Sequence, residues 1–175
     1  VPAERVLAVT FTNKAANEMK NRLRKMVGLA SRELWVGTFH AISCRILRYD
    51  IQHLGRENSF VIFDEADQLH LVRECLKEED ISDKRFKPAS VLSAISSAKN
   101  ELLTPKQFLQ QARDYFQDTV GSLYERYQKK LIEQNGLDFD DILMTAVELL
   151  QKCPEVLAKY QERFQYIHVD EYQDT

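Results

Sequence analysis

The sequence predicts an α/β fold in which a parallel sheet is interrupted by a large all-helical insertion. Short runs rich in apolar and β-branched residues, near residues 6, 34 and 166, have the composition of buried strands. The first two runs flank a helical segment, and a strand-helix-strand unit implies parallel strands. From about residue 64 to residue 164 the chain has helical character and few glycines. An all-helical block is therefore expected between strands of one sheet.

The first strand is expected over Val6–Phe11, because a parallel strand covered on both faces needs apolar or β-branched residues at every position. A helix should follow at once, since Thr12 or Asn13 can cap its N-terminus and apolar residues then recur at helical spacing. Gly28 stands where a left-handed residue ends a helix. Leu34–Gly37 is then expected to form the second strand.

A second helix is expected over His40–Leu54, ending at Gly55. The short apolar run Phe60–Phe63 follows. The central block is then expected to form six helices, at Asp64–Lys77, Pro88–Asn100, Pro105–Tyr115, Val120–Asn135, Phe139–Lys152 and Pro154–Phe164.

Start signals support several of these helices. Three prolines occupy first-turn positions, where a missing N–H leaves no intrahelical bond unmade. Asp138 can cap the helix that begins at Phe139, while Asp140 and Asp141 favour its positive N-terminal end. Capping explains these three aspartates better than a metal cluster does. Tyr166–Val169 then returns to strand character.

The composition indicates an ordinary globular protein and excludes several classes. The chain has 175 residues, of which 44% are hydrophobic and 29% charged. No apolar run approaches the ~18 to 20 residues of a membrane-spanning helix. Cys44, Cys75 and Cys153 are odd in number and widely spaced, which argues against a disulfide framework or a zinc site. A reducing, cytoplasmic compartment is expected.

The N-terminus has no signal peptide and no initiator methionine, which suggests a piece of a longer protein.

The charge is unevenly distributed along the chain. Residues 1–60 hold ten Lys and Arg against five Asp and Glu, whereas the remaining residues hold 14 against 22. A nucleic-acid surface beside an acidic metal-nucleotide site or partner surface would produce this asymmetry. Solvated faces produce such charge runs as well, so the asymmetry alone does not decide the function.

Two segments have the form of an apolar strand that delivers an aspartate to magnesium and a following glutamate to an attacking water. The first is Phe60–Asp67, which contains the letters of the DEAD tetrapeptide and would suggest an RNA helicase using Asp64 and Glu65. Its alternative is structural, with Asp64 as the cap of a helix. The second segment is Tyr166–Thr175. None of the five glycines has the G-x-x-x-x-G-K-[ST] spacing of a phosphate-binding loop.

Four motifs in order resemble those of the UvrD, PcrA and Rep group of superfamily 1 DNA helicases. Leu7–Met19 looks like motif Ia, Gly37–Ile42 resembles motif Ib, Leu137–Leu143 is similar to the DFDDL segment, and Val169–Thr175 looks like motif II. The motifs extend over essentially the whole chain, and the resemblance is strongest to the PcrA and UvrD branch.

The resemblance implies a partial RecA-like fold, that of the P-loop NTPases. Residues 1–58 and 165–175 would form part of domain 1A, and residues 59–164 the helical insertion called domain 1B. In this family a Walker A loop precedes motif Ia, a second RecA-like domain completes the ATP site, and the motor moves 3′ to 5′ on single-stranded DNA. The intact parent would use ATP and magnesium, but this chain is expected to bind neither and to be inactive as an ATPase.

The same resemblance assigns roles to individual residues. Asp170 would hold magnesium and Glu171 would polarise the attacking water. Phe11 would stack on a base, unless it is a core aromatic. Polar side chains at two helix N-termini would contact DNA, although threonines there also serve as simple caps. The expected DNA contacts are Thr10, Phe11, Thr12, Asn13, Lys14, Thr38, Phe39 and His40. Lys99 is a further candidate for contact with duplex phosphates, against the default of a solvated lysine.

The expected partners are single-stranded DNA and its junctions with duplex DNA, in repair or replication, with no membrane. Sheet edges left exposed would favour dimerisation. The alternative function is a non-enzymatic helical module that binds DNA or docks a protein, with the α/β part as scaffold.

Overall fold

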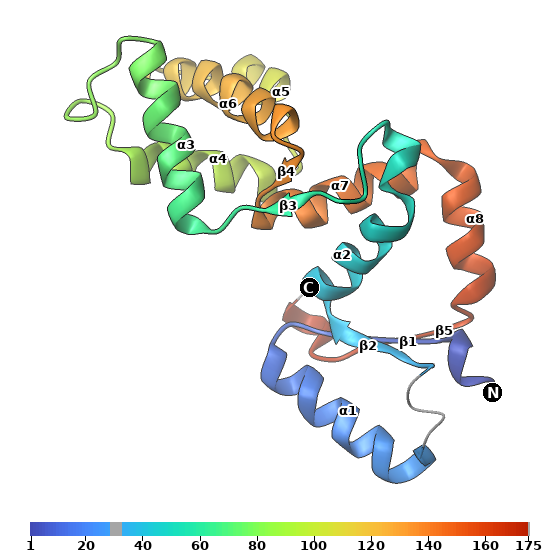
Figure 1. Cartoon of the computed structure of the whole chain (residues 1–175). Coiled ribbons are helices and arrows are strands. Elements are labelled where there is room, and N and C mark those ends of the chain that lie inside the picture. The colour runs from blue at the N-terminus through green and yellow to red at the C-terminus, as the bar shows by residue number, and fades with distance from the viewer. Residues whose placement is uncertain (29–32, 175) are drawn as a thin grey trace. The chain divides into compact units, whose positions relative to one another are not determined.

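The computed structural model describes residues 1–28 and 33–174 (Figure 1). Thr175, the last residue of the motif at the C-terminus, lies outside the described residues. The chain forms two compact units. The first contains residues 1–58 and 145–175, and the second contains residues 59–144. No helix in the described residues combines the length and the apolar character needed to cross a membrane.

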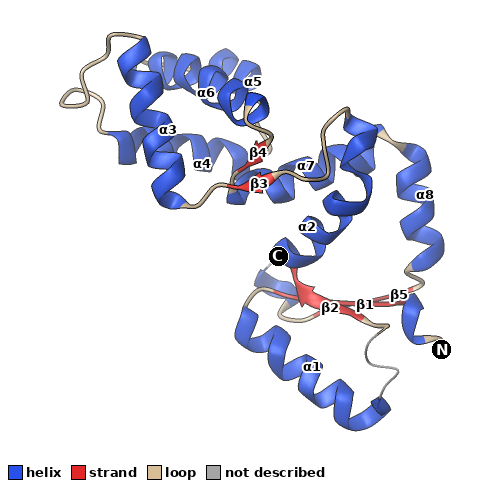
Figure 2. Ribbon diagram, viewed as in Figure 1, coloured by secondary structure: helices blue, strands red, loops and turns tan. Residues whose placement is uncertain are grey.

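The first unit is built on a three-stranded parallel sheet (Figure 2). The strands are β1 (Val6–Thr10), β2 (Trp35–Thr38) and β5 (Tyr166–Val169), in the order β2-β1-β5. Strand β1 pairs in parallel with both neighbours, Val9 lying opposite Gly37 on one side and Val169 on the other. The predicted α/β fold with a parallel sheet is therefore confirmed.

Helix α1 (Asn13–Val27) lies on one side of this sheet, and α2 (Phe39–Asp50) and α8 (Pro154–Arg163) lie on the other (Figure 1). Helix α1 begins where predicted because the Thr12 hydroxyl accepts a hydrogen bond from the Ala15 N–H at 3.1 Å. The second helix ends earlier than predicted, at Asp50, and continues as a single 3-10 turn, η3 (Ile51–Leu54).

The second unit is almost entirely helical, as predicted. Its helices are α3 (Glu65–Glu78), α4 (Pro88–Asn100), α5 (Pro105–Gln111), α6 (Tyr115–Glu133) and the start of α7 (Phe139–Lys152). Their apolar faces enclose one core, in which the largest fully buried side chains include Tyr124, Tyr127, Leu71 and Leu131. Two short strands, β3 (Val61–Ile62) and β4 (Gly136–Leu137), pair in parallel and form a separate sheet.

The boundary between α5 and α6 differs from the prediction. The sequence analysis extended the earlier helix to Tyr115 and began the next at Val120, whereas α5 ends at Gln111 and α6 already begins at Tyr115. Asp114 causes the difference, because its carboxylate accepts a hydrogen bond from the Gln117 N–H at 2.8 Å and so caps α6. The capping residue Asp114 could have predicted this helix start, but the spacing of the apolar residues favoured a later start at Val120.

The C-terminal boundary of the helical insertion differs from the prediction. The insertion was expected to span residues 59–164, but residues 145–164 belong to the first compact unit. The reason is the packing of α8 on α2. The buried Asp50 carboxylate accepts hydrogen bonds from the Tyr160 hydroxyl at 2.6 Å and from the Lys159 ammonium at 2.7 Å. Helical periodicity identifies α8 as a helix but does not reveal which core it packs against.

Lys99 is the largest departure from expectation in the second unit. Its side chain is fully buried, and its ammonium lies 2.6 Å from a carboxylate oxygen of Asp138 and 2.8 Å from one of Asp141. The same two carboxylates accept hydrogen bonds from the Tyr127 hydroxyl and the Gln128 side-chain amide. Lys99 is therefore an interior ion-pair partner, and the suggestion that it contacts duplex phosphates is wrong.

Asp138 and Asp141 also cap helix α7, as predicted from the sequence. The Asp141 N–H donates to the Asp138 carboxylate at 2.8 Å, and the Asp138 N–H donates to the Asp141 carboxylate at 3.2 Å. One ammonium thus faces two carboxylates in a site shielded from water. Burial raises the pKa of the Asp141 carboxyl above its ordinary value, an effect that the adjacent Lys99 partly offsets.

Replacing Lys99 by methionine should strongly destabilise the helical unit. The substitution preserves the side-chain length but leaves two buried carboxylates without a cation, which costs about 3 to 5 kcal/mol in comparable buried pairs. The free energy of unfolding, measured by urea titration with far-ultraviolet circular dichroism, should fall by that amount. The exposed Lys106→Met is the matched control and should change stability by less than about 0.5 kcal/mol. Equal effects of the two substitutions would contradict the buried ion pair.

The raised pKa of Asp141 predicts a distinctive pH dependence. A carboxyl whose pKa is higher in the folded than in the unfolded state stabilises the fold below the ordinary value of 3.8 and loses this contribution as pH rises through the folded value. On acidification from pH 7 toward pH 4, the wild-type chain should therefore gain stability relative to Asp141→Asn. Urea titrations of both proteins at several pH values test this. A difference in unfolding free energy that does not vary with pH would refute it.

Candidate nucleic-acid and magnesium site

The predicted site residues gather at the carboxyl edge of the three-stranded sheet. Because β1, β2 and β5 are parallel, their C-terminal residues Thr10, Thr38 and Val169 end at the same edge. This is the edge at which open α/β sheets bind their ligands. Residues far apart in the sequence, such as Thr10 and Asp170, therefore lie close together.

An aromatic pair occupies the ends of the two neighbouring strands β1 and β2. Phe11 is 42% exposed, which excludes the alternative of a core aromatic. Phe39, the first residue of α2, is half-buried beside it, and the two ring centroids lie 5.2 Å apart with the ring planes tilted by 51°. This spacing is within the range of favourable aromatic pairs. The two rings offer an apolar surface to solvent, and the sequence alone did not predict that they touch.

Polar groups from the first turns of α1 and α2 surround this pair. The hydroxyls of Thr12 and Thr38 accept hydrogen bonds from backbone N–H groups within their own helices, each at 3.1 Å, and so act as caps. Asn13 and Lys14 are exposed in the first turn of α1, and His40 is half-buried in the first turn of α2. The positive end of the α1 dipole and the Lys14 ammonium together favour an anion at this position.

Thr10 lies at the predicted edge of the sheet, but its side chain does not face solvent there. Its side chain is only 1% exposed, and its hydroxyl faces the Asp170 carboxylate at 3.4 Å. Direct contact with DNA phosphates was the wrong prediction for this residue, because the last residue of a central strand is covered by its neighbours. The backbone joins the same two strands, since the Asp170 N–H donates to the Val9 carbonyl at 2.9 Å.

Asp170 and Glu171 follow β5 and are both exposed. Glu171 has a left-handed backbone, with φ 54°, a conformation that costs a residue other than glycine about 1 kcal/mol. The Gln173 side-chain amide donates a hydrogen bond to the Glu171 carboxylate. Asp170 stays available to solvent on one side while Thr10 faces it on the other.

These groups fit a magnesium ion of the kind that binds nucleotides. Magnesium prefers oxygen ligands and is usually held by one or two carboxylates, with water and substrate phosphates completing its coordination. Asp170 and Glu171 are hard oxygen ligands of this type. No cluster of three or more His, Cys, Asp or Glu side chains within residues 1–28 and 33–174 forms a dedicated metal cage. The arrangement therefore suits a shared protein-phosphate magnesium site.

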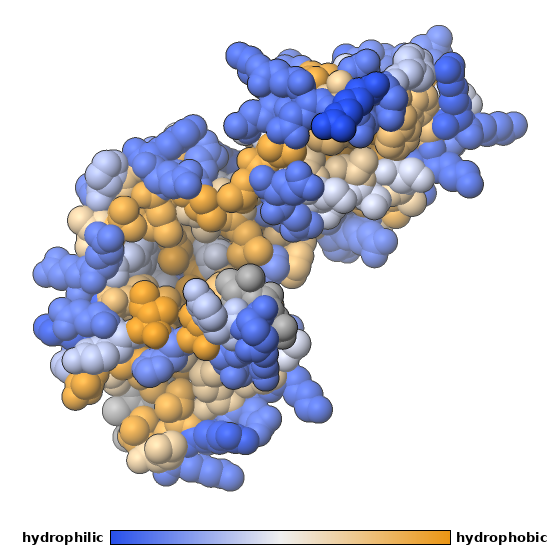
Figure 3. All heavy atoms as spheres, turned by 180° about the vertical axis from the view of Figure 1, so that it is seen from behind, coloured by the Kyte–Doolittle hydropathy of each residue, from blue (hydrophilic) through white to orange (hydrophobic). Residues whose placement is uncertain are grey.

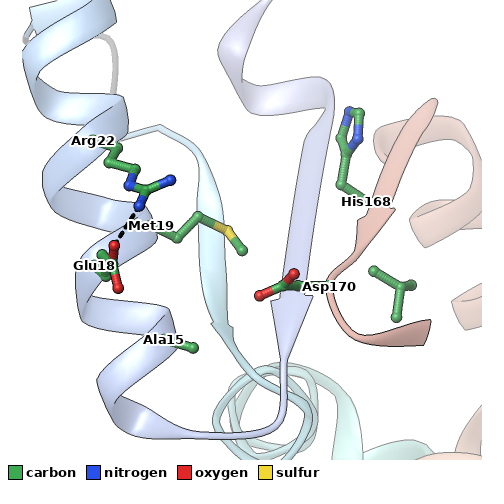
Figure 4. Close-up of a pocket in the computed structure, with 7 residues that line it drawn as sticks. Ala15, Glu18, Met19, Arg22, His168 and Asp170 are labelled. Carbon is green, nitrogen blue, oxygen red and sulfur yellow. Dashed lines mark hydrogen bonds and ion pairs between the residues drawn. The ribbon is translucent and has the colours of Figure 1, made fainter. Parts of the chain in front are cut away.

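A cavity of about 410 Å³ lies beside Asp170, between α1 and β5 (Figure 4). Ala15, Met19 and the ion pair of Glu18 with Arg22 line it from α1, and His168 of β5 and Asp170, the residue after β5, line it from the other side. The sequence analysis did not single out His168, Glu18 or Arg22. Their common location follows from the pairing of β5 beside β1, which the spacing of residues along the chain does not show.

The competing motif at Asp64 has a structural role. The Asp64 carboxylate accepts a hydrogen bond from the Asp67 N–H at 2.9 Å, and Asp67 in turn accepts from the Asp64 N–H, which makes a capping box at the start of α3. The preceding strand β3 pairs with β4 and has no place in the three-stranded sheet. The RNA-helicase alternative required Asp64 at the end of a core strand and is therefore wrong.

Comparison with known proteins agrees with this geometry. The family model described as the UvrD/REP helicase N-terminal domain matches residues 1–175. The ATP-dependent DNA helicase PcrA of Bacillus subtilis is 50% identical over 170 residues, and the proteins of that name from Staphylococcus aureus and Staphylococcus epidermidis are 49% and 47% identical. Each alignment covers 97% of this chain and 23% of the relative. The chain spans less than a quarter of the length of these relatives, and it belongs to the UvrD/REP helicase N-terminal domain family.

Proposed function

We propose that this chain is the segment of an ATP-dependent DNA helicase that carries part of the single-stranded DNA track and the magnesium-binding carboxylate. The observation that supports this proposal most directly is the shared edge of the sheet. The exposed Phe11 follows Thr10 in β1, and Thr10 faces Asp170 at the end of β5. The whole protein would convert ATP hydrolysis into 3′ to 5′ movement on DNA, in repair or replication.

The aromatic pair would bind bases without regard to sequence. An exposed ring stacks on any base, for about 1 to 3 kcal/mol per base. Lys14 and Asn13, in the first turn of α1, would contact the phosphates between stacked bases. A motor that moves along DNA needs contacts of this type, because they are equivalent at every nucleotide.

The carboxylates would serve the nucleotide. Bound magnesium would neutralise charge on the transferred phosphoryl group. Asp170 would hold the ion, Thr10 would orient the Asp170 carboxylate, and Glu171 would position the attacking water. The left-handed backbone at Glu171 directs the chain away from the strand immediately after Asp170.

Strand β1 would connect the two functions. Its residue Thr10 contacts the magnesium carboxylate, and the next residue, Phe11, contacts the base. A shift of β1 relative to β5 would therefore alter both sites together, as coupling between ATP hydrolysis and DNA movement requires. A docking module with an inert α/β scaffold has no need for this arrangement.

Replacing Phe11 by alanine should weaken the binding of single-stranded DNA about tenfold, because the exposed stacking surface is lost. Fluorescence anisotropy of a labelled oligonucleotide, titrated with the 175-residue chain at low salt, measures the dissociation constant. The matched control is Phe116→Ala in the helical unit, where the ring is 38% exposed. It should leave binding unchanged. Unaltered affinity in Phe11→Ala would favour the docking module over the helicase.

The chain by itself should show no ATP turnover above buffer, because its sequence contains no G-x-x-x-x-G-K-[ST] loop to hold the phosphates. Release of inorganic phosphate, followed with and without magnesium and single-stranded DNA, measures this. The Glu171→Gln variant should give the same baseline. Magnesium-dependent turnover that disappears in this variant would show that the 175 residues form a complete active site.

A further inference from the structure

The single tryptophan of the chain lies at the edge of the sheet opposite the candidate site. Trp35 is the first residue of β2, whereas Thr38, at the carboxyl edge, is the last. Three residues of strand separate them, about 10 Å. The Trp35 side chain is 1% exposed, and the aromatic rings packed against it come from α2, from α8 and from Phe164, the residue after α8. All of these elements belong to the first compact unit.

Two arginines hold their guanidinium groups against the Trp35 ring. The Arg45 guanidinium carbon, from α2, lies 3.9 Å from the ring centroid, and that of Arg163, from α8, lies 4.9 Å from it. The two cationic centres are therefore at most about 9 Å apart and repel each other. Cation–π contact with the ring offsets this repulsion.

Neither guanidinium is neutralised by an acid. Arg45 and Arg163 are both exposed, and none of the ion pairs in the part of the chain that the structure describes includes either of them. The contrast with Lys159 is informative, because this neighbour on α8 pairs with Asp50. The guanidinium N–H donors of Arg45 and Arg163 therefore stay available to an anion.

Aromatic groups adjoin the two cations. Tyr49, one turn after Arg45 on α2, stacks toward Trp35 with ring centroids 6.3 Å apart, yet is 55% exposed. The indole N–H of Trp35 is buried and has no hydrogen-bond acceptor. The surface therefore combines an exposed aromatic ring with two guanidiniums that form no ion pair among the described residues. We call these three residues, Arg45, Tyr49 and Arg163, the amino-edge surface.

We propose that the amino-edge surface binds the phosphate backbone of single-stranded nucleic acid, as a second contact separate from the Phe11 track. The fork of N–H donors on each guanidinium matches phosphate oxygens, and two such groups at most about 9 Å apart can bind one phosphate or two adjacent ones. The exposed face of Tyr49 offers a stacking surface to the adjoining base. An acidic peptide would use the two cations but would leave the exposed ring without a partner.

Trp35 itself provides the test, because it is the only tryptophan in the chain and the two arginines touch it. Its fluorescence is recorded while unlabelled oligothymidylate is added to the 175-residue chain at low salt. Binding at the amino-edge surface should change the Trp35 emission with the same midpoint as the anisotropy of a labelled strand. An emission unchanged at saturating oligonucleotide would overturn the proposal.

The variant Arg45→Gln/Arg163→Gln should lose the emission change and bind oligonucleotide about three- to tenfold more weakly, with a shallower salt dependence. Arg24→Gln/Lys25→Gln, in the last turn of α1, removes the same charge and should retain the emission change. Circular dichroism shows whether the glutamine variant is folded. If it is not, the variant Arg45→Lys/Arg163→Lys replaces it, because this variant keeps both positive charges but loses the guanidinium forks. The lysine variant should show a reduced but measurable change in Trp35 emission. A full response in a folded glutamine variant would refute the proposal.

Two further experiments distinguish binding at the amino-edge surface from binding at the Phe11 track and from the binding of other anions. Phe11→Ala should keep the Trp35 response while losing affinity, so failure of the Phe11 track and failure of the amino-edge surface give different results. Inorganic pyrophosphate and polyglutamate are titrated at matched charge concentration. A Trp35 response to either as strong as that to oligothymidylate would overturn the assignment to nucleic acid.

Discussion

The parallel pairing of β1 with two neighbours is the constraint on which the rest of the first unit depends. Because β1 lies between β2 and β5, its residues Ala8, Val9 and Thr10 are buried on both sides, and all three strands end at one edge. The capped starts of α1 and α2 and the carboxylates after β5 are consequently brought to that edge. An antiparallel β5 would carry Asp170 to the opposite end of the sheet.

The burial of Thr10 changes the role that its motif suggested for it. The next residues in the motif, Phe11 and Thr12, are exposed, whereas the Thr10 hydroxyl is buried and faces Asp170. The end of the strand separates these residues, since Thr10 is the last residue of β1 and Phe11 is the first one beyond it. The proposed DNA track and the proposed magnesium site thus meet at one edge of the sheet, at the end of β1.

The helical unit relies on a different kind of interaction, a buried ammonium shared by two carboxylates. Lys99 of α4 reaches the capping box at the start of α7, where each carboxylate uses one oxygen for the cap and the other for the ion pair. Such a group adds little net stability compared with apolar packing, because desolvation offsets the Coulomb attraction. Its geometry is demanding, however, and it fixes the N-terminus of α7 with respect to α4.

By itself the sequence determined the fold class, the three strands of the parallel sheet, most helix starts and the motifs that contain Asp170, Glu171 and Phe11. Buried runs, capping residues and motif spacing are local properties, and local energetics suffices to interpret them. Only the tertiary structure decided that Phe11 and Phe39 touch, that Thr10 faces Asp170, that Lys99 is interior and that α8 packs with the first unit. The arginines on Trp35 likewise come from helices far apart in the chain. These contacts depend on which buried faces meet in the folded chain. The sequence around an apolar or charged residue does not identify the distant residue that it contacts.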